Sequence, residues 1–313
     1  MNFRQISAFV AVYEEGSFSR AAERLNATQS GLSMQIQNLE AQAGLRLFDR
    51  TSRGVAPTHA GRHFYTRATA ILRQVAEAGM ELENLGGTIS GEIRIGLMPT
   101  FTRGALPPAL AGFLREYPNV RVSITEAYSA VLTDQVASGS LDFAVVPKAP
   151  GRDGLRSSYL GTDRELLVCR AGTGPAHLAP ARLADMPPLH LVLPAPGNAR
   201  RDMFEAYAEI HGVPIAAIVD MDAMIATLEF VANSDWMTIL PTTICYNDLD
   251  GGVRTLHPLV EPPLTVDYVL IERATGALSP AAKVFLEHLR TRLETINAHW
   301  AAKLAGRGAY QKS

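Results

Sequence analysis

Apolar residues in the N-terminal part of the chain recur at helical spacing in three successive runs. The first run predicts a helix over residues 2–14. Ser17 and Thr28 are good N-caps for a second and a third helix, the second ending at Asn26-Ala27 and the third at Gly44. The apolar faces consist of Phe3, Ile6, Phe9, Val10 and Tyr13, then Ala21, Ala22 and Leu25, then Leu32, Ile36 and Leu39. Two short helices joined by a tight turn predict a helix-turn-helix.

A hairpin and a long helix are predicted next. Residues 45–57 are typical of a wing, because 50–54 (Arg-Thr-Ser-Arg-Gly) provide turn residues and Pro57 ends the run. Thr58 caps a helix that extends to Leu85. Its apolar positions are Ala60, Phe64, Ala68, Ile71, Val75, Ala78, Leu82 and Leu85. The spacing approaches the repeat of about 3.5 residues of a coiled coil, which predicts pairing with a second subunit. The alternative is an amphipathic helix docked on its own chain.

The pattern changes after a glycine-rich hinge at 86–91. Strands then alternate with helices up to about residue 300, which predicts parallel sheets with helices on both faces. The predicted strands are 92–97, 120–126, 141–146, 166–169, 190–193, 218–221, 237–240 and 266–272. The predicted helices are 106–116, 131–138, 201–211, 223–233 and 279–298. The last residues, 301–313, are expected to fray.

Composition limits the class of protein. A chain of 313 residues is long enough for two or three domains, and no apolar run approaches the roughly 20 residues of a membrane span. The N-terminus lacks a secretory signal, so a cytoplasmic protein without a membrane partner is expected. Cys169 and Cys245 have no metal-type spacing, and no cofactor or metal is predicted.

Charge is distributed unevenly. Residues 1–75 hold nine arginines and five acids, a charge of +4, whereas the whole chain is −2, which leaves −6 for the remainder. Residues 1–75 thus form a basic N-terminal segment, here called the head, and the remainder is acidic. This difference suggests that the head alone binds nucleic acid. Six of these arginines lie between residues 46 and 73, where guanidinium groups suit phosphate contacts. The alternative is an ordinary solvated basic surface.

The residues predicted to contact DNA are Ser17, Arg20, Thr28, Gln29, Ser30, Ser33, Met34, Gln37, Arg50 and Arg53.

The N-terminal motifs resemble those of LysR-type transcriptional regulators. The resemblance covers residues 1–65 and rests on 17–22 (Ser-Phe-Ser-Arg-Ala-Ala), Gln29-Ser30, Ser33, Ile36, Leu39-Glu40, Gly44, 47–50 (Leu-Phe-Asp-Arg) and 58–61 (Thr-His-Ala-Gly). It implies a winged helix-turn-helix over 1–58, a linker helix over 59–85 that forms a homodimer, and assembly to a tetramer. Double-stranded promoter DNA and RNA polymerase are the implied macromolecular partners. Met34 departs from the family, where this position is usually basic.

The remainder, 92–300, resembles the family's effector-binding domain more loosely. The motifs are 91–96 (Gly-Glu-Ile-Arg-Ile-Gly), 141–144 (Leu-Asp-Phe-Ala), 228–232 and Ile239-Leu240-Pro241. A two-lobed α/β domain like that of periplasmic solute-binding proteins is implied, with the chain crossing near 161–164 and 263–267. The first lobe would take 92–161 and 267–300, and the second 162–266. Residues 233–237 replace the glycine-rich turn usual in the family.

A small-molecule effector is expected at the carboxyl ends of the strands. The residues predicted there are Pro99, Thr100, Phe101, Tyr128, Ser129, Pro147, Lys148, Gly197, Asn198, Arg200 or Arg201, and Asp222. Helix-start N–H groups and hydroxyls favour an organic or aromatic carboxylate. The alternatives are that Thr100, Ser129 and Asp222 are N-caps and that Arg200, Arg201 and Lys148 are surface charges.

Three other functions remain as alternatives. An enzyme has no support, because no phosphate-binding loop, GxSxG, HExxH or GxGxxG motif is present. A transport-type solute-binding protein would need export. Oxidant sensing would use Cys169, which ends an apolar strand, or Cys245, which is expected at a helix start where the pKa of a thiol falls.

Overall fold

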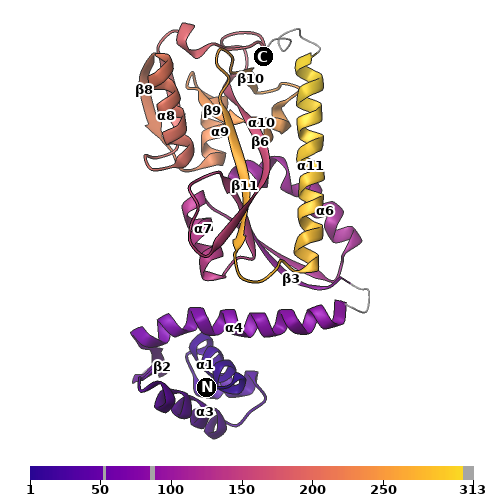
Figure 1. The fold of residues 1–313 in the computed structure, drawn as a ribbon. Coiled ribbons are helices and arrows are strands. Elements are labelled where there is room, and N and C mark those ends of the chain that lie inside the picture. Colours follow the sequence, from indigo (N-terminus) through magenta and orange to yellow (C-terminus); the bar gives the residue numbers. More distant parts are fainter. Residues whose placement is uncertain (52–53, 85–88, 306–313) are drawn as a thin grey trace. The chain divides into compact units, whose positions relative to one another are not determined.

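The computed structural model describes residues 1–51, 54–84 and 89–305. It divides into two compact units, Met1–Thr88 and Ile89–Ser313 (Figure 1). The first contains α1 (Phe3–Glu15), α2 (Phe18–Arg24), α3 (Gln29–Ala43), the antiparallel pair β1 (Phe48–Thr51) and β2 (Gly54–Pro57), and α4 (His59–Asn84). The predicted winged helix-turn-helix is therefore present.

The three short helices begin and end where their capping residues require. The side chains of Asn2, Ser17 and Thr28 accept hydrogen bonds from backbone N–H groups of the first turns. Gly16 and Gly44 end α1 and α3 in the left-handed region, which a side chain rarely adopts. Apolar faces of the helices and the hairpin meet in one core, formed by Ile6, Phe9, Val12, Ala21, Leu32, Ile36, Leu39, Leu47 and Phe48.

The long helix α4 packs on its own chain over its first half. Phe64 lies 4.8 Å from Phe9 between ring centroids, Tyr65 stacks on Tyr13 at 3.9 Å, and Ala68 is fully buried. Beyond these contacts Val75 is 49% exposed. Docking on the same chain, the alternative to pairing, therefore holds for the first half of α4, whereas Val75 in the second half is not covered by its own chain. Leu85, the last residue of the predicted helix, lies outside the described residues.

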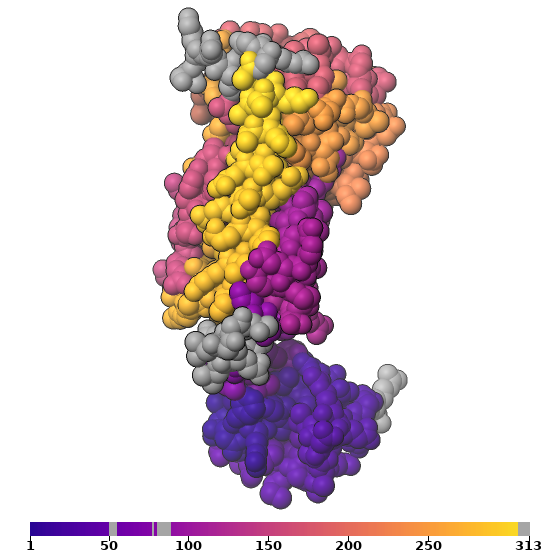
Figure 2. Space-filling view, turned by 90° about the vertical axis from the view of Figure 1, so that its right-hand side faces the viewer, coloured from indigo at the N-terminus to yellow at the C-terminus, as the bar shows by residue number. Residues whose placement is uncertain are grey.

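The second unit begins with a parallel β-α-β lobe. Its elements are β3 (Gly91–Leu97), α5 (Pro99–Gly104), α6 (Leu106–Glu116), β4 (Val120–Glu126), α7 (Ser129–Ser138) and β5 (Phe143–Pro147). β3 lies between β4 and β5, and both pairings are parallel. The C-terminal helix α11 (Pro280–Ala305) packs beside α6, as Figure 2 shows on the face turned to the viewer. Phe113 of α6 and Phe285 of α11 meet edge to face in the core.

Two long antiparallel strands connect this lobe to the second one. β6 (Leu155–Arg170) pairs with β11 (Thr265–Arg273) over its first part, and beyond Arg164 it pairs instead with β9 (Thr238–Pro241) and β10 (Arg254–Pro258). The second lobe adds β7 (Leu189–Leu193), α8 (Ala199–His211), β8 (Ile215–Asp220), α9 (Met224–Ala232) and α10 (Thr242–Cys245). β7 and β8 are parallel, and a separate core gathers around Leu191 and Phe204.

The structure corrects several expectations. The large sheet is mixed rather than parallel, because β5, β11, β6 and β10 pair antiparallel. Sequence periodicity missed the helices α5 and α10, which are too short to show it, and the strand β10, whose residues do not alternate between apolar and polar. Gly91 belongs to β3 and not to the hinge, whose residues 86–88 lie outside the described part of the chain. α11 continues to Ala305, with Trp300 and Leu304 buried, so residues 301–305 are not frayed. No helix within the described ranges is both long and apolar enough to span a membrane.

Candidate nucleic-acid interface and effector site

The second helix of the helix-turn-helix, α3, has one buried and one exposed face. Leu32, Ile36 and Leu39 are at most 3% exposed. On the other side Gln29, Ser30 and Gln37 are exposed, Met34 is 57% exposed, and Ser33 is half-buried at the margin. Five of the residues predicted to contact DNA therefore lie together on one helix, with hydroxyl and amide groups that match hydrogen-bonding groups on base edges.

Two of the predicted DNA contacts act within the protein. The Ser17 hydroxyl accepts a hydrogen bond from the Arg20 N–H at 3.4 Å, and the Thr28 hydroxyl accepts one from the Gly31 N–H at 3.2 Å. These bonds satisfy N–H groups that a helix start leaves without a partner. Both hydroxyls therefore cap the N-termini of helices, as their sequence positions also predicted.

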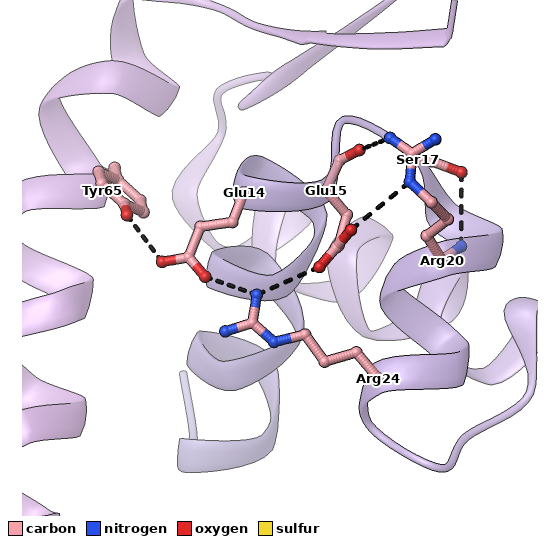
Figure 3. A network of polar contacts seen from close by, with 6 residues as sticks. All are labelled: Glu14, Glu15, Ser17, Arg20, Arg24 and Tyr65. Carbon is pink, nitrogen blue, oxygen red and sulfur yellow. Dashed lines mark hydrogen bonds and ion pairs between the residues drawn. The ribbon is translucent and has the colours of Figure 1, made fainter.

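A network of polar and charged side chains joins α1, α2 and α4 (Figure 3). Arg20 donates to the backbone oxygen of Glu15 and lies 3.5 Å from its carboxylate. Arg24 lies between Glu14, at 2.6 Å, and Glu15, at 3.4 Å. The Tyr65 hydroxyl donates to Glu14 at 2.7 Å, and burial followed by this carboxylate raises the pKa of Tyr65 to about 12. The guanidinium of Arg20 is thus oriented by Glu15, while its side chain stays exposed.

The wing is attached to α3 by a carboxylate that sequence reasoning left unassigned. One oxygen of Glu40 accepts from the backbone N–H groups of Leu47, at 2.7 Å, and Phe48, at 3.1 Å. Arg50 belongs to β1, but its side chain falls outside the described residues, as does all of Arg53. Contacts across a turn leave no periodic signal, so the role of Glu40 could not be read from spacing.

The residues predicted to bind an effector lie mainly around the junction of the two lobes. Thr100 and Phe101 are inside α5 and 1% exposed, and Tyr128 and Ser129 start α7. Pro147 is buried at the end of β5, Lys148 and Gly197 are exposed, and Pro99 is buried. Asn198 caps α8 by accepting from the Arg200 N–H at 3.0 Å.

The proposed N-cap roles of Thr100, Ser129 and Asp222 are wrong. The capping positions of α5, α7 and α9 are Met98, Tyr128 and Ala223, and none of the three uses a side-chain bond. Asp222 instead accepts from the Ala195 N–H at 3.1 Å, which joins the loops that follow β7 and β8. The side chains of Thr100 and Ser129 are consequently not explained by helix capping.

The interpretation of Arg200 and Arg201 as surface charges is also wrong, since they are 7% and 6% exposed. Arg200 binds both oxygens of Glu165 on β6, at 3.3 and 2.8 Å, and also donates to the Ile239 carbonyl at 2.9 Å. Arg201 donates to Asp220 at 2.9 Å and pairs with Glu205. Because a buried guanidinium needs such partners, both arginines hold the second lobe together. Burial raises the pKa of Glu165, and the charge of Arg200 opposes this effect.

A groove of about 380 Å³ lies between α5 of the first lobe and α9 of the second. Its lining consists of Pro99, Thr102, Arg103, Glu126, Met224, Ile225, Leu228, Glu229 and Arg254. Arg103 and Arg254 share the Asp248 carboxylate, at 2.9 and 3.0 Å. The Arg254 Nε is buried and has no hydrogen-bond partner within the described ranges.

Only Pro99 of this lining was predicted from the sequence. Arg103 and Arg254 lie in α5 and β10, two elements that the periodicity did not reveal. A basic residue in such a short apolar stretch carries no signal that separates a groove from an exposed surface.

Both cysteines are buried free thiols. Burial raises the pKa of Cys169 to about 12, and it raises the pKa of Cys245 well above its usual value. Cys245 is the last residue of α10 and precedes a 3-10 turn over Tyr246–Asp248, but burial outweighs this position at a helix start, so the expected lowering of its pKa is wrong. A thiol is oxidised through its thiolate, and these positions disfavour the thiolate.

Comparison with known proteins identifies the family. Residues 3–62 match the bacterial regulatory helix-turn-helix protein, lysR family, and residues 86–294 match the LysR substrate binding domain. The nitrogen assimilation regulatory protein nac of Klebsiella aerogenes is 30% identical over 92% of this chain and 94% of its own length. The regulator GbpR of Azospirillum brasilense is 27% identical over 94% of this chain and 87% of its own.

Solved structures show the same fold. Full-length CbnR complexed with its target DNA superposes with a TM-score of 0.65 at 23% identity, covering 93% of this chain and 100% of that one. HinK from Pseudomonas aeruginosa gives a TM-score of 0.54 at 25% identity, covering 94% and 98%. The chain belongs to the LysR family and is a DNA-binding transcriptional regulator with an effector-binding domain.

Proposed function

We propose that this regulator reads a specific operator by placing α3 in the major groove. The observation that supports this proposal is the exposed face of α3, where Ser30, Met34 and Gln37 point away from the buried Leu32 and Ile36. A helix of this kind fits the major groove, and uncharged polar side chains distinguish base pairs there. The wing, with Arg50 and Arg53, contacts the phosphates or the minor groove and sets the orientation of the head.

Two copies pair through the second half of α4. The exposed Val75 and Ala78 continue the apolar stripe beyond the part that packs on α1. A pair of heads matches an operator with two half-sites, and two such dimers form the tetramer. A complex of this size spans several half-sites and is in a position to contact RNA polymerase beside them.

The effector is a small organic or aromatic carboxylate that binds between the lobes. The α5–α9 groove offers two guanidinium groups, Arg103 and Arg254, and the Arg254 Nε lacks a partner among the described residues. The first lobe, which contributes α5 to the groove, also carries the hydroxyl groups of Thr100 and Ser129 and the start of α7. Binding that favours one arrangement of the lobes changes how dimers pack, and therefore the spacing of the heads.

A gel-shift experiment tests both the reading of an operator and the binding of a carboxylate effector. The probe is the DNA upstream of the protein's own gene, at two salt concentrations, with and without a panel of carboxylates. We expect a specific shift that weakens with salt, because arginine–phosphate contacts release counterions. One acid should change the pattern of shifted bands. Ile225→Glu, which adds a carboxylate to the groove lining at an exposed position, should reduce the response to that acid and leave the shift without acid unchanged, whereas Ile210→Glu, at an exposed residue of α8 outside the lining, should alter neither.

Operator reading and carboxylate binding can be contradicted independently of each other. Absence of any specific shift would contradict operator reading. A specific shift that responds only to cationic or uncharged metabolites would contradict the carboxylate, while leaving DNA recognition intact.

A further inference from the structure

Met34 occupies the crest of the exposed face of α3. With about 3.6 residues per turn, Ser30, Met34 and Gln37 follow one another along one side of the helix. Leu32, Ile36 and Leu39 define the opposite, buried side. Met34 is therefore the large side chain that projects from this face, and 57% of its surface is exposed.

The surroundings of Met34 are polar but uncharged. Its exposed polar neighbours along α3 are Ser30, Gln37 and Asn38. The one charged residue of α3, Glu40, accepts from the backbone of the wing. No hydrogen bond or ion pair fixes the side chain of Met34 within the described part of the chain. An apolar side chain at this crest gains little in the free protein, since more than half of its surface stays in contact with water.

Base-pair edges in the major groove present one apolar group, the 5-methyl group of thymine. A flexible, polarizable thioether adapts well to such a group. We propose that Met34 contacts the 5-methyl group of one thymine in each half-site and so makes the regulator select an A·T pair at that position. This inference rests on the proposed insertion of α3 into the major groove and adds to it a specific base.

A basic residue at position 34 would act differently. Lysine or arginine pairs with guanine O6 and N7 or with phosphate, and so favours a G·C pair or adds a salt-dependent contact. Met34 supplies neither, and its contact is insensitive to salt. The base preference at this position therefore follows from the side chain itself rather than from the charge of the head.

Replacement of thymine by deoxyuridine isolates the methyl group, because uracil pairs with adenine in the same way. Binding sites are first selected from a random DNA library with the full-length protein. Each thymine of the selected site is then replaced in turn. We expect one position per half-site at which the change weakens binding about fourfold, the value for one buried methyl-sized group.

The same replacements with Met34→Ala complete the test. Alanine favours the helix and the position is exposed, so the variant folds. The deoxyuridine effect at that one position should vanish in Met34→Ala and persist in Leu45→Ala, which changes another exposed apolar residue just after α3. Met34→Lys should shift the selected base away from thymine and steepen the salt dependence by about one phosphate contact.

Two outcomes would overturn the proposal. Selection of a site in which no thymine shows a Met34-dependent effect would refute the methyl contact while leaving DNA recognition in place. Failure of the wild-type protein to select any sequence would instead refute operator reading itself, and the methyl contact with it.

Discussion

Ser17 and Arg200 illustrate, at the scale of single residues, how groups suited to bind DNA or an anion are used inside the protein. The hydroxyl of Ser17 accepts the N–H of Arg20 at the start of α2. Arg200 is enclosed beside Glu165, and removal of one partner from such a buried pair typically costs about 3–5 kcal/mol. Neither role depends on a ligand. Residue type alone therefore did not separate contacts within the fold from contacts with a partner.

His257 provides a prediction at the same scale. The ring is fully buried, with nitrogens 3.1 Å from the Ala179 carbonyl and 3.2 Å from the Thr255 hydroxyl. Burial lowers the pKa of His257 below 6.5, and the nearby His177 adds to this. As the pH falls below 6.5, the unfolded chain therefore binds more protons than the folded protein. Acid destabilises the fold in this range, and well above pH 6.5 His257 makes no such pH-dependent contribution.

Urea unfolding of the wild type and of His257→Gln, each at about pH 7.5 and about pH 5.5, measures this contribution. The variant is expected to be less stable at the higher pH, because a buried amide replaces the ring. Its further loss at the lower pH should be smaller than that of the wild type, by up to about 1.4 kcal/mol per pH unit. Equal losses in both proteins would show that the imidazole does not carry the effect.

At the scale of elements, the short helices α5 and α10 determine how closely the lobes approach. They meet at Gly104, where an added Cβ would lie 1.8 Å from the backbone oxygen of Thr243. Trp300 of α11 donates to the Thr242 carbonyl at 3.0 Å and holds α10 in place. Glycine is required here by close approach and not by its backbone angles. The long strands β6 and β11 connect the same two lobes, so α5, α10 and the crossing strands form one junction.

Gly104→Ala should therefore destabilise the second unit. The methyl group cannot be accommodated without moving the backbone of Thr243, and such overpacking typically costs about 1–3 kcal/mol. Gly112→Ala in α6 is the matched control, because its Cβ meets only ring atoms of His288, the nearest at 3.4 Å, and alanine favours a helix interior. Thermal unfolding should show a lower midpoint for Gly104→Ala and an unchanged or higher one for Gly112→Ala. A midpoint for Gly104→Ala equal to that of the wild type would contradict the close contact.

On the scale of the whole molecule, α4 is the element through which we propose that two copies pair. Its first half contributes Phe64 and Ala68 to the core of the head. Its second half leaves Val75 exposed, although the apolar spacing continues. One helix thus serves the fold of its own chain, and its exposed apolar positions are those that we propose contact a second copy.

Val75→Glu should dissociate the dimer, because two carboxylates would meet across the paired helices. Ala76→Glu adds the same charge one residue further along, off the apolar stripe, and should leave the assembly intact. Sedimentation measurements distinguish the two variants. Cooperative binding to an operator with two half-sites should weaken in parallel with dimerisation. A dimer that survives Val75→Glu would place the pairing surface elsewhere.

Local sequence determined much of this protein. The helix-turn-helix followed from the caps Ser17 and Thr28, the stop at Gly44 and the spacing of Leu32, Ile36 and Leu39, because capping and periodicity act between residues within a few positions of each other. The strand-and-helix alternation of the second unit was predictable for the same reason, and α6 and β4 have the predicted bounds. The position of Met34 on the exposed face of α3 also follows from spacing alone.

Only the tertiary structure decided which polar groups have partners and where the lobes leave space. Glu165 and Arg200 are 35 positions apart, and Arg103 lies 145 positions from Asp248, so no local pattern pairs them. The antiparallel pairing of β6 with β11 joins distant segments of the chain and turned an expected parallel sheet into a mixed one. Burial likewise set the pKa of Cys245, which a position in the sequence cannot reveal. Contacts of this kind arise when distant segments pack, and the groove between α5 and α9 exists only as their result.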